Sequence, residues 1–294
     1  VLILILKLFD HGSFVDQLYF VPGAPLSALQ LVSALVLFVI FFFLEQNKPN
    51  RPKTKVLWIV ITFFLIWGIT FLVWNATPFT CTDDRPGPYP PNYQCYPTIN
   101  DAVYSIGSHY ITLGQGIYNQ WLTDKPAYML FLALAQWLAG QRIDNYITFQ
   151  VAFLSLIPAL LFLLGKKGMG VAGGVFVALL ALLEGSNAIL LYQKVGSINP
   201  KLEATELLTS VFLIVFCLAV FKWFTNPRNH IWAAIAGGIL GLAALIRFTP
   251  VFILPGILLT YLICNRKKPK TFIIGIAVLL LTFCLSFTPF VVTA

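Results

Sequence analysis

Long apolar runs, separated by short polar or basic stretches, set the pattern of the chain. The runs are apolar on every side and approach the length of about 20 residues that a helix needs to cross a bilayer. They lie at 27–44, 56–74, 146–164, 169–184, 204–223, 231–246, 248–264 and 271–292, and residues 1–9 resemble part of a further run. A bilayer admits only helices and closed barrels, and the alternation of a barrel is missing from this sequence. We therefore predict an all-α polytopic membrane protein of about 8–9 spans.

The composition supports this prediction. Hydrophobic residues make up 59% of the chain and charged residues only 10%, whereas an ordinary soluble domain has about 25% charged residues. The mean hydropathy is +0.84. The net charge of +8 comes from clusters of Lys and Arg between the apolar runs. Such clusters orient membrane spans, so we expect no nucleic-acid partner.

The basic clusters also predict which side of the membrane each loop faces. They lie at 45–55, 165–168, 221–230 and 265–270, and the positive-inside rule assigns all of them to the cytoplasm. This is possible only if 126–140 does not cross. That run is about 15 residues long and begins at a proline, so we expect a re-entrant or membrane-surface helix. Segments 75–125 and 185–203 then face the exoplasm.

Segment 75–125 collects polar residues in an otherwise apolar chain. Its first part, CTDDRPGPYPPNYQC, is rich in Pro, Gly and Tyr, which predicts an irregular loop. Cys81 and Cys95 bracket this loop on the oxidising side of the membrane, where a disulfide can form. A disulfide closing a loop of this size would contribute about 3 kcal/mol in the chain-entropy model. The spacing alone leaves a disulfide and two free thiols equally open.

The next part, NDAVYSIGSHYITL, predicts an amphipathic helix that lies on the membrane surface. One face carries Asp101, Tyr104, Ser105 and Ser108, and the other carries Val103, Ile106, Tyr110 and Leu113. From spacing alone, the plainer explanation of Asp101 is a first-turn carboxylate favoured by the helix dipole. Asp124 and Lys125 are similarly explained as the polar start of the following helix.

The stretch DAVYSIGSHYITLGQGIYNQWLTDKPAYMLFLALAQWLAG resembles the first exoplasmic loop of the GT-C membrane glycosyltransferases, in particular the protein-mannosyltransferase and aminoarabinose-transferase type. Members show an acidic residue followed by Tyr, then Gly and Tyr, then D/E/N-K-P-P before an apolar helix. The matching positions are Asp101, Tyr104, Gly114, Tyr118, Asp124, Lys125 and Pro126. The chain departs from the motif at Ala127, which replaces the second proline, and at Asn100–Asp101, where many members have Asp–Glu.

Two later stretches extend the resemblance. NPKLEATELLTSVFLIVFCLAV resembles the family's acidic motif at the head of a membrane helix, with Glu206 as the better match and Glu203 as the alternative. GGILGLAALIRFTPVFILP resembles its G-L-A-x-L-x-K/R segment, whose basic residue is Arg247. From its position alone, Arg247 is also compatible with a side chain that snorkels from a helix end.

The resemblance covers residues 75–292 and implies a domain division. Residues 1–55 are expected to form N-terminal membrane segments and a cytoplasmic basic loop. Residues 56–294 are expected to form a GT-C-like transmembrane helix bundle, with amphipathic surface helices in the exoplasmic loop 75–125. Family members continue well beyond this length, so the module is expected to be incomplete at its C-terminal end.

The resemblance also implies the chemistry. The activity would be an inverting transfer of a sugar from a polyprenyl-phosphate donor to an extracytoplasmic glycan, lipid or protein acceptor, at a bacterial plasma membrane. Asp101 would act as general base on the acceptor, while Lys125 and Arg247 would stabilise the phosphate as it leaves. The further residues expected to bind substrate are Tyr104, Asp124 and Glu206.

The expected co-substrate is the polyprenyl-phosphate sugar, and no other cofactor is implied. His11 and His109 have no metal-ligand spacing with Cys or another His, so we expect no metal site, and dependence on a divalent metal stays open. The polyprenyl tail must remain among membrane lipids while its phosphate reaches Lys125. We therefore expect an apolar groove that leads from the lipid to the polar residues.

Two other function classes remain open. A secondary transporter would carry its acids and bases near the bilayer midplane and would show inverted repeats and broken helices, which this sequence does not display. A non-catalytic scaffold, or a degenerate relative that has lost activity, is compatible with Ala127 and with the length of the chain.

Overall fold

The structure, a computed structural model, describes most of the chain. The described residues are 24–46, 52–77, 81, 86–90, 93, 95–97, 99–117, 125–190, 199–265 and 269–291. Every regular element within these ranges is a helix, in agreement with the all-α prediction. Contacts divide the chain into two compact units, the first comprising Val1–Thr80 with Ser155–Pro200 and the second Cys81–Leu154 with Lys201–Ala294. Residue 55, where we expected the N-terminal part to end, lies in the first turn of α3, within the first unit.

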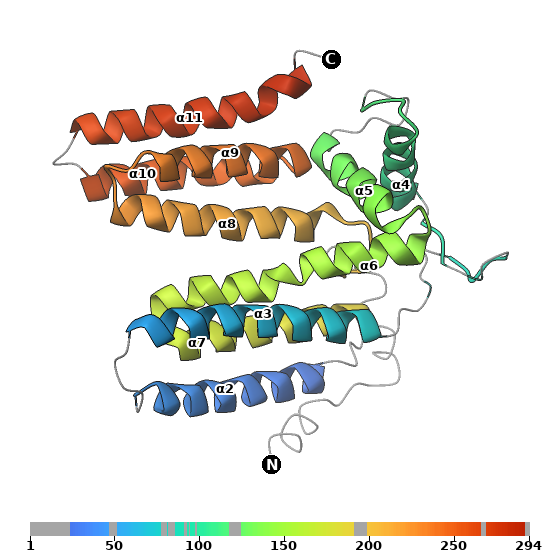
Figure 1. The fold of residues 1–294 in the computed structure, drawn as a ribbon, viewed down its shortest axis with the longest axis horizontal. Helices are drawn as coiled ribbons and strands as arrows, with labels where there is room; N and C mark the ends of the chain where they lie inside the picture. The colour runs from blue at the N-terminus through green and yellow to red at the C-terminus, as the bar shows by residue number, and fades with distance from the viewer. Residues whose placement is uncertain are drawn as a thin grey trace, which may run out of the picture. The chain divides into compact units, whose positions relative to one another are not determined.

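The first unit contains α2 (Ala24–Gln46), α3 (Pro52–Ala76) and α7 (Leu156–Leu190), and both α2 and α3 pack against α7 (Figure 1). The backbone of α7 leaves the helical conformation at Met169 and Gly170. A Cβ on Gly174 would lie 2.5 Å from the carbonyl oxygen of Phe162. Residues on the two sides of the break therefore pack against each other, so α7 is a helical hairpin. The break falls on the first two residues of the run expected at 169–184 and separates it from the run expected at 146–164.

Trp74 fixes α3 against α7 within the first unit. Its indole N–H donates a hydrogen bond of 2.9 Å to the carbonyl oxygen of Leu182, and the side chain is only 2% exposed. Gly185 gives the ring its space, because a Cβ at that position would overlap the indole. A large aromatic side chain on one helix is thus matched by a glycine on its neighbour.

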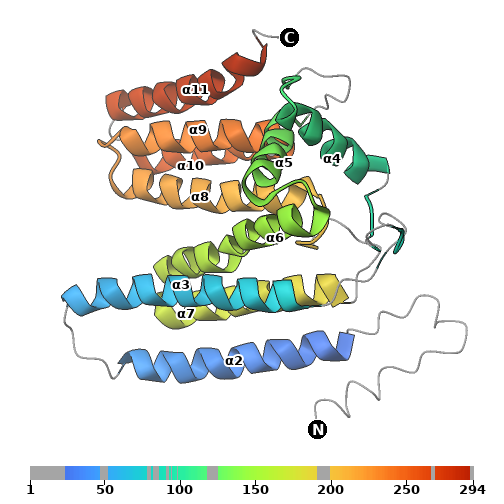
Figure 2. The same cartoon turned by 45° about the vertical axis from the view of Figure 1, so that its right-hand side comes forward.

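The second unit contains the remaining helices. They are α4 (Ile99–Thr112), α5 (Pro126–Ala139), α6 (Ile143–Leu154), α8 (Thr205–Thr225), α9 (Ile231–Ile246), the 3₁₀ turn η3 (Thr249–Ile253), α10 (Leu254–Asn265) and α11 (Pro269–Val291). Helix α9 lies between α8 and α11 (Figures 1 and 2). A short connection joins α8 to α9, so the two helices are antiparallel and the start of α8 lies beside the end of α9.

Small residues allow α9 and α11 to approach closely. A Cβ on Gly237 would overlap the backbone of Leu279, and one on Gly241 would lie 2.5 Å from the Cβ of Ser286. The Ser286 hydroxyl donates a hydrogen bond of 3.2 Å to the carbonyl oxygen of Gly238. Such close backbone contact is typical of helices that pack in a membrane, where burial of apolar surface drives association only weakly.

Prolines interrupt two runs that the sequence predicts as single spans. The run at 146–164 is divided at Ser155 between α6 and α7. Pro158 lacks the amide hydrogen that would bond to the carbonyl of Leu154, which ends α6. The run at 248–264 begins as η3, which contains Pro250, before the chain continues as α10.

Within the described residues, three segments are long and apolar enough to cross a membrane, namely Val56–Ala76, Ile143–Ile189 and Thr205–Thr225. The second of these contains the break in α7. Shorter apolar helices cover Leu31–Phe43, Pro126–Ala139, Ile231–Ile246, Thr249–Ile263 and Ile273–Thr288. These lengths agree with an integral membrane protein, while the count of 8–9 spans remains a prediction. Helix α5, at 14 residues, is about 21 Å long, shorter than the roughly 30 Å hydrocarbon core.

Candidate functional site

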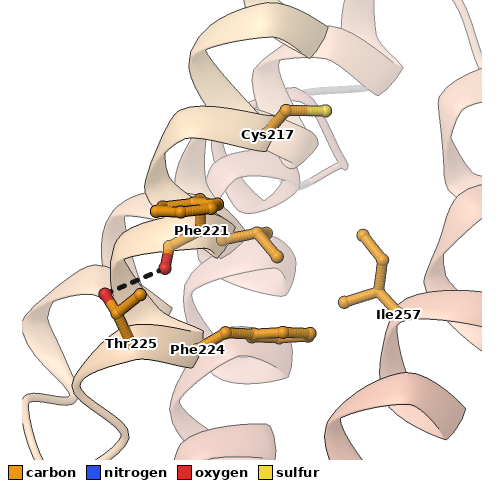
Figure 3. A pocket seen from close by; sticks show the side chains of 6 residues that line it. Cys217, Phe221, Phe224, Thr225 and Ile257 are labelled. Carbon is orange, nitrogen blue, oxygen red and sulfur yellow. Dashed lines mark hydrogen bonds between the residues drawn. The ribbon is translucent and has the colours of Figure 1, made fainter. Parts of the chain in front are cut away.

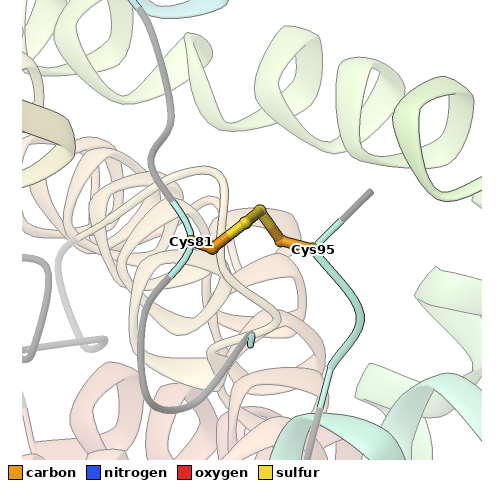
Figure 4. Close-up of a disulfide and its surroundings, with 2 residues drawn as sticks. All are labelled: Cys81 and Cys95. Atoms are coloured by element: carbon orange, nitrogen blue, oxygen red, sulfur yellow. A yellow bond between two sulfur atoms is a disulfide. The ribbon is translucent and has the colours of Figure 1, made fainter. Parts of the chain in front are cut away.

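A disulfide closes the loop that precedes α4. Cys81 and Cys95 are bonded to each other, with their Cα atoms 5.3 Å apart (Figure 4). The backbone N–H of Tyr96 donates a hydrogen bond of 3.2 Å to the carbonyl oxygen of Pro86 within the same loop. Of the two states that the sequence left open, the structure has the bonded pair, which constrains the chain shortly before α4 begins.

Helix α4 turns its polar face toward the protein. Tyr104 is 9% exposed and Ser108 is fully buried, whereas Ile106 and Leu113 on the opposite face are 38% and 58% exposed. A helix on the surface of a soluble protein shows the reverse arrangement. Exposed apolar residues suit a helix that lies against lipid, and the polar face is covered by α5, which packs on α4.

The two expected acids of this region are described only in part. Asp101 lies in the first turn of α4, but its side chain is outside the described residues, as are the whole of Asp124 and Tyr118. The assignment of Asp101 as general base therefore remains a prediction. Ser105 lies one helical turn further along the same face of α4 and forms a hydrogen bond of 3.1 Å with the hydroxyl of Tyr146.

Lys125 and Tyr104, which are 21 residues apart in the sequence, contact each other. Lys125 occupies the N-cap position of α5, immediately before Pro126. Its ammonium group donates a hydrogen bond of 2.5 Å to the Tyr104 hydroxyl and lies 5.1 Å from the centre of that ring. The Tyr104 ring packs edge-on against the buried ring of Tyr128, with centroids 5.2 Å apart. The start of α5 thus holds a cation against the polar face of α4.

A buried amide joins α5 to α4. Gln136 is 4% exposed, and its side-chain nitrogen donates a hydrogen bond of 2.8 Å to the hydroxyl of Ser108. That hydroxyl in turn donates to the carbonyl oxygen of Ser105 at 2.8 Å. A buried amide is costly unless it is paired, so this contact fixes how the two helices face each other.

A second buried polar group joins α6 to the segment before α8. Tyr146 donates its hydroxyl hydrogen to a carboxylate oxygen of Glu203 at 2.6 Å, and the Glu203 side chain is only 1% exposed. Because this uses the one hydrogen of the phenol, Ser105 must be the donor in its bond to Tyr146. Gln150 donates to the carbonyl oxygen of Leu202 at 2.7 Å. Glu203, the weaker match in the sequence, is thus the more deeply buried of the two acids.

Glu206 and Arg247 form an ion pair across α8 and α9. Glu206 lies in the first turn of α8, and Arg247 follows the last turn of α9. The antiparallel packing of these helices brings the two positions together. Their side chains are 37% and 39% exposed, so the pair lies at the edge of the unit with its charges still accessible. Arg247 is thus held by a carboxylate as well as lying at a helix end.

These groups gather at one end of the second unit. Helix α5 contacts α9, α6 contacts α8, and both views show α4, α5 and α6 at the same end of α8 and α9 (Figures 1 and 2). Burial also lowers the pKa of Lys201, which lies two residues before Glu203 in the sequence. Among the residues that the structure describes, no group of three or more His, Cys, Asp or Glu could hold a metal ion.

Three side chains of this region were missed by the sequence analysis: Gln136, Tyr146 and Gln150. The signal was present, because both amides interrupt apolar stretches, in AQWLAG and ITFQVAF. A polar side chain in an apolar helix has to be paired when it is buried. The sequence does not identify the partner of each side chain, because every partner comes from a distant part of the chain.

The structure also contains an apolar cavity of about 370 Å³ between α8 and α10 (Figure 3). It extends to Thr225, the last residue of α8, which is about 28 Å from Glu206 by the rise of the helix. This cavity is therefore not the expected groove from the lipid to the polar residues, and that groove remains a prediction.

Neither a protein-family model, nor a curated protein, nor a solved structure matches the chain. Its own residues and their geometry therefore carry any functional proposal.

Proposed function

We propose that the chain is a membrane glycosyltransferase that transfers a sugar from a polyprenyl-phosphate donor to an acceptor outside the cytoplasm. The observation that supports this most directly is the contact between Lys125 and Tyr104. Both belong to the motif that resembles the GT-C glycosyltransferases, and packing of α4 on α5 brings them together at one end of the helices.

Lys125 and Arg247 are the proposed phosphate ligands. Both are already paired, Lys125 with Tyr104 and Arg247 with Glu206. An ammonium group has three hydrogens to donate and a guanidinium group has five, so each cation can donate to more than one acceptor. Glu206 can therefore orient Arg247 while the remaining N–H groups bind phosphate oxygens.

Asp101 is the proposed general base. It would remove the proton of the acceptor hydroxyl or amine while the acceptor atom attacks the anomeric carbon. The bond from that carbon to the phosphate oxygen breaks in the same step, which inverts the configuration and leaves the negative charge on the lipid phosphate. Lys125 and Arg247 would stabilise this charge.

Buried hydrogen bonds hold the two turns of α4 that follow the proposed base. Ser105 lies one turn after Asp101 on α4, and its bond to Tyr146 connects it to Glu203. Gln136 holds the next turn through Ser108. Proton transfer requires that the base and the acceptor lie within hydrogen-bond reach, so a rigid α4 favours the proposed chemistry.

The test is transfer of labelled sugar by the purified full chain in proteoliposomes, from a panel of polyprenyl-phosphate hexoses and pentoses. Lys125→Ala is expected to lower transfer by about a hundredfold, the effect of removing one donor that stabilises developing charge. Lys167→Ala is the matched control, because Lys167 is an exposed lysine of the α7 turn in the first unit. Full transfer by Lys125→Ala would contradict the proposal. A wild-type chain that is inactive with every donor would favour the non-catalytic alternative.

A further inference from the structure

The cavity between α8 and α10 has walls that offer almost no polar group. Its lining residues are Cys217, Val220, Phe221, Phe224, Thr225 and Ile257 (Figure 3). The Thr225 hydroxyl donates within its own helix, to the carbonyl oxygens of Phe221 and Lys222 at 3.1 and 3.0 Å. An occupant therefore gains little from polar contacts with the walls and must be largely hydrocarbon.

Aromatic packing keeps this cavity open. Tyr261 of α10 stacks on Trp223 of α8 with ring centroids 4.0 Å apart and lies 5.3 Å from Phe224. Trp223 and Tyr261 are both fully buried, so they fix the spacing of the two helices. Ile257 lies one turn before Tyr261 and borders the cavity. Phe221, on the rim, is 41% exposed, so the cavity opens at the surface of the second unit.

The C-terminal end of α8, where the cavity lies, carries basic residues, and no acidic residue lies close to them in the sequence. Lys222 lies in the last turn of α8, Arg228 follows three residues after Thr225, and both are exposed. The sequence RKKPK follows α10 at 266–270, and no Asp or Glu occurs anywhere after Glu206. An apolar cavity therefore lies beside a charge that attracts anions.

We propose that this cavity binds an acyl chain of an anionic phospholipid from the surrounding bilayer, with the phosphate of its headgroup at Lys222 and Arg228. Basic clusters beside membrane helices attract anionic headgroups, each Lys or Arg strengthening the attraction. The apolar walls accept the chain, and the two cations distinguish an anionic from a zwitterionic headgroup. The site lies at the opposite end of α8 from Glu206, and it does not depend on the proposed glycosyl transfer.

The first test compares phosphatidylglycerol with phosphatidylcholine of identical acyl chains. The purified full chain is titrated with each lipid in detergent, and bound lipid is counted by native mass spectrometry. We expect about a tenfold preference for phosphatidylglycerol, which the double variant Lys222→Gln, Arg228→Gln reduces to near unity. Equal binding of both lipids by the wild-type chain would overturn the proposal, as would an unchanged preference in the double variant.

The second test fills the cavity. Cys217→Phe places a ring in the lining and is expected to lower binding of phosphatidylglycerol at least tenfold. Cys284→Phe is the matched control, because Cys284 is an exposed free cysteine of α11 that does not line the cavity. Ile257→Phe fills the cavity from α10, so a folding defect in one variant leaves the other informative. Wild-type binding by both filled variants would place the lipid elsewhere and refute the site.

Discussion

The two ends of α8 differ in what they bury. At its start, Glu203 is buried in a hydrogen bond to Tyr146, and Glu206 is paired with Arg247. At its end, the buried side chains are the rings of Trp223 and Tyr261. Burying a polar group costs free energy that an apolar side chain of similar size avoids. Trp223 and Tyr261 each bury one neutral polar group within a large ring that packs, whereas Glu203 buries a whole carboxyl group. The polar end therefore has the greater need of a functional explanation.

The largest expected effect falls at the polar end. Asp101→Asn keeps the shape of the side chain and its ability to cap a helix but removes the proton acceptor. Transfer of labelled sugar should fall by about two to four orders of magnitude, the usual contribution of a general base, while donor affinity stays near the wild-type value. Near-normal transfer would exclude Asp101 as the base and would favour the plainer explanation, a first-turn carboxylate.

Removal of the α9 cation should have the next largest effect. Arg247→Ala is expected to lower transfer by about two orders of magnitude, because the leaving phosphate loses a charged donor. The control is Arg142→Ala, since Arg142 also faces an acid, Asp144, at 4.0 Å but with side chains 68% and 62% exposed. An exposed pair contributes about 0–1 kcal/mol, so that variant should remain active and stable. Equal losses in both variants would argue against a specific role for Arg247.

A single buried hydroxyl should matter for stability at the polar end. Tyr146→Phe removes a donor from the buried carboxylate of Glu203 and is expected to lower the free energy of unfolding by about 1–3 kcal/mol. Unfolding by denaturant titration in micelles measures this value. Tyr93→Phe is the control, because Tyr93 is 72% exposed. A Tyr146→Phe chain as stable as the control would mean that the hydrogen bond contributes nothing.

The smallest effect is expected at the aromatic end. Thr225→Val also removes a hydroxyl, but this hydroxyl donates only to carbonyl groups of its own helix. The free energy of unfolding should change by no more than about 0.5 kcal/mol in the same titration. A loss as large as that of Tyr146→Phe would show that the two ends do not differ in how they use polar groups.

Much of the fold follows from local pattern. The run expected at 231–246 coincides with α9, Ile231–Ile246, and the stretch at 126–140 matches the short α5. The sequence GKKG at 165–168 predicts a connection immediately before Met169 and Gly170, where α7 breaks. These features depend on residues close together in the sequence, such as apolar periodicity, proline and glycine, so they can be recognised before any tertiary contact is known.

The polar and apolar faces of α4 are predictable from its own residues, because a helical period of 3.6 residues sorts the side chains. The tertiary structure was needed to show that the polar face is the covered one, through Gln136 of α5 and Tyr146 of α6. It likewise decided that Glu206 meets Arg247, 41 residues further along the chain. Helical periodicity describes one helix at a time. A hydrogen bond or an ion pair between two helices also depends on which helices are neighbours and on where along their lengths they meet.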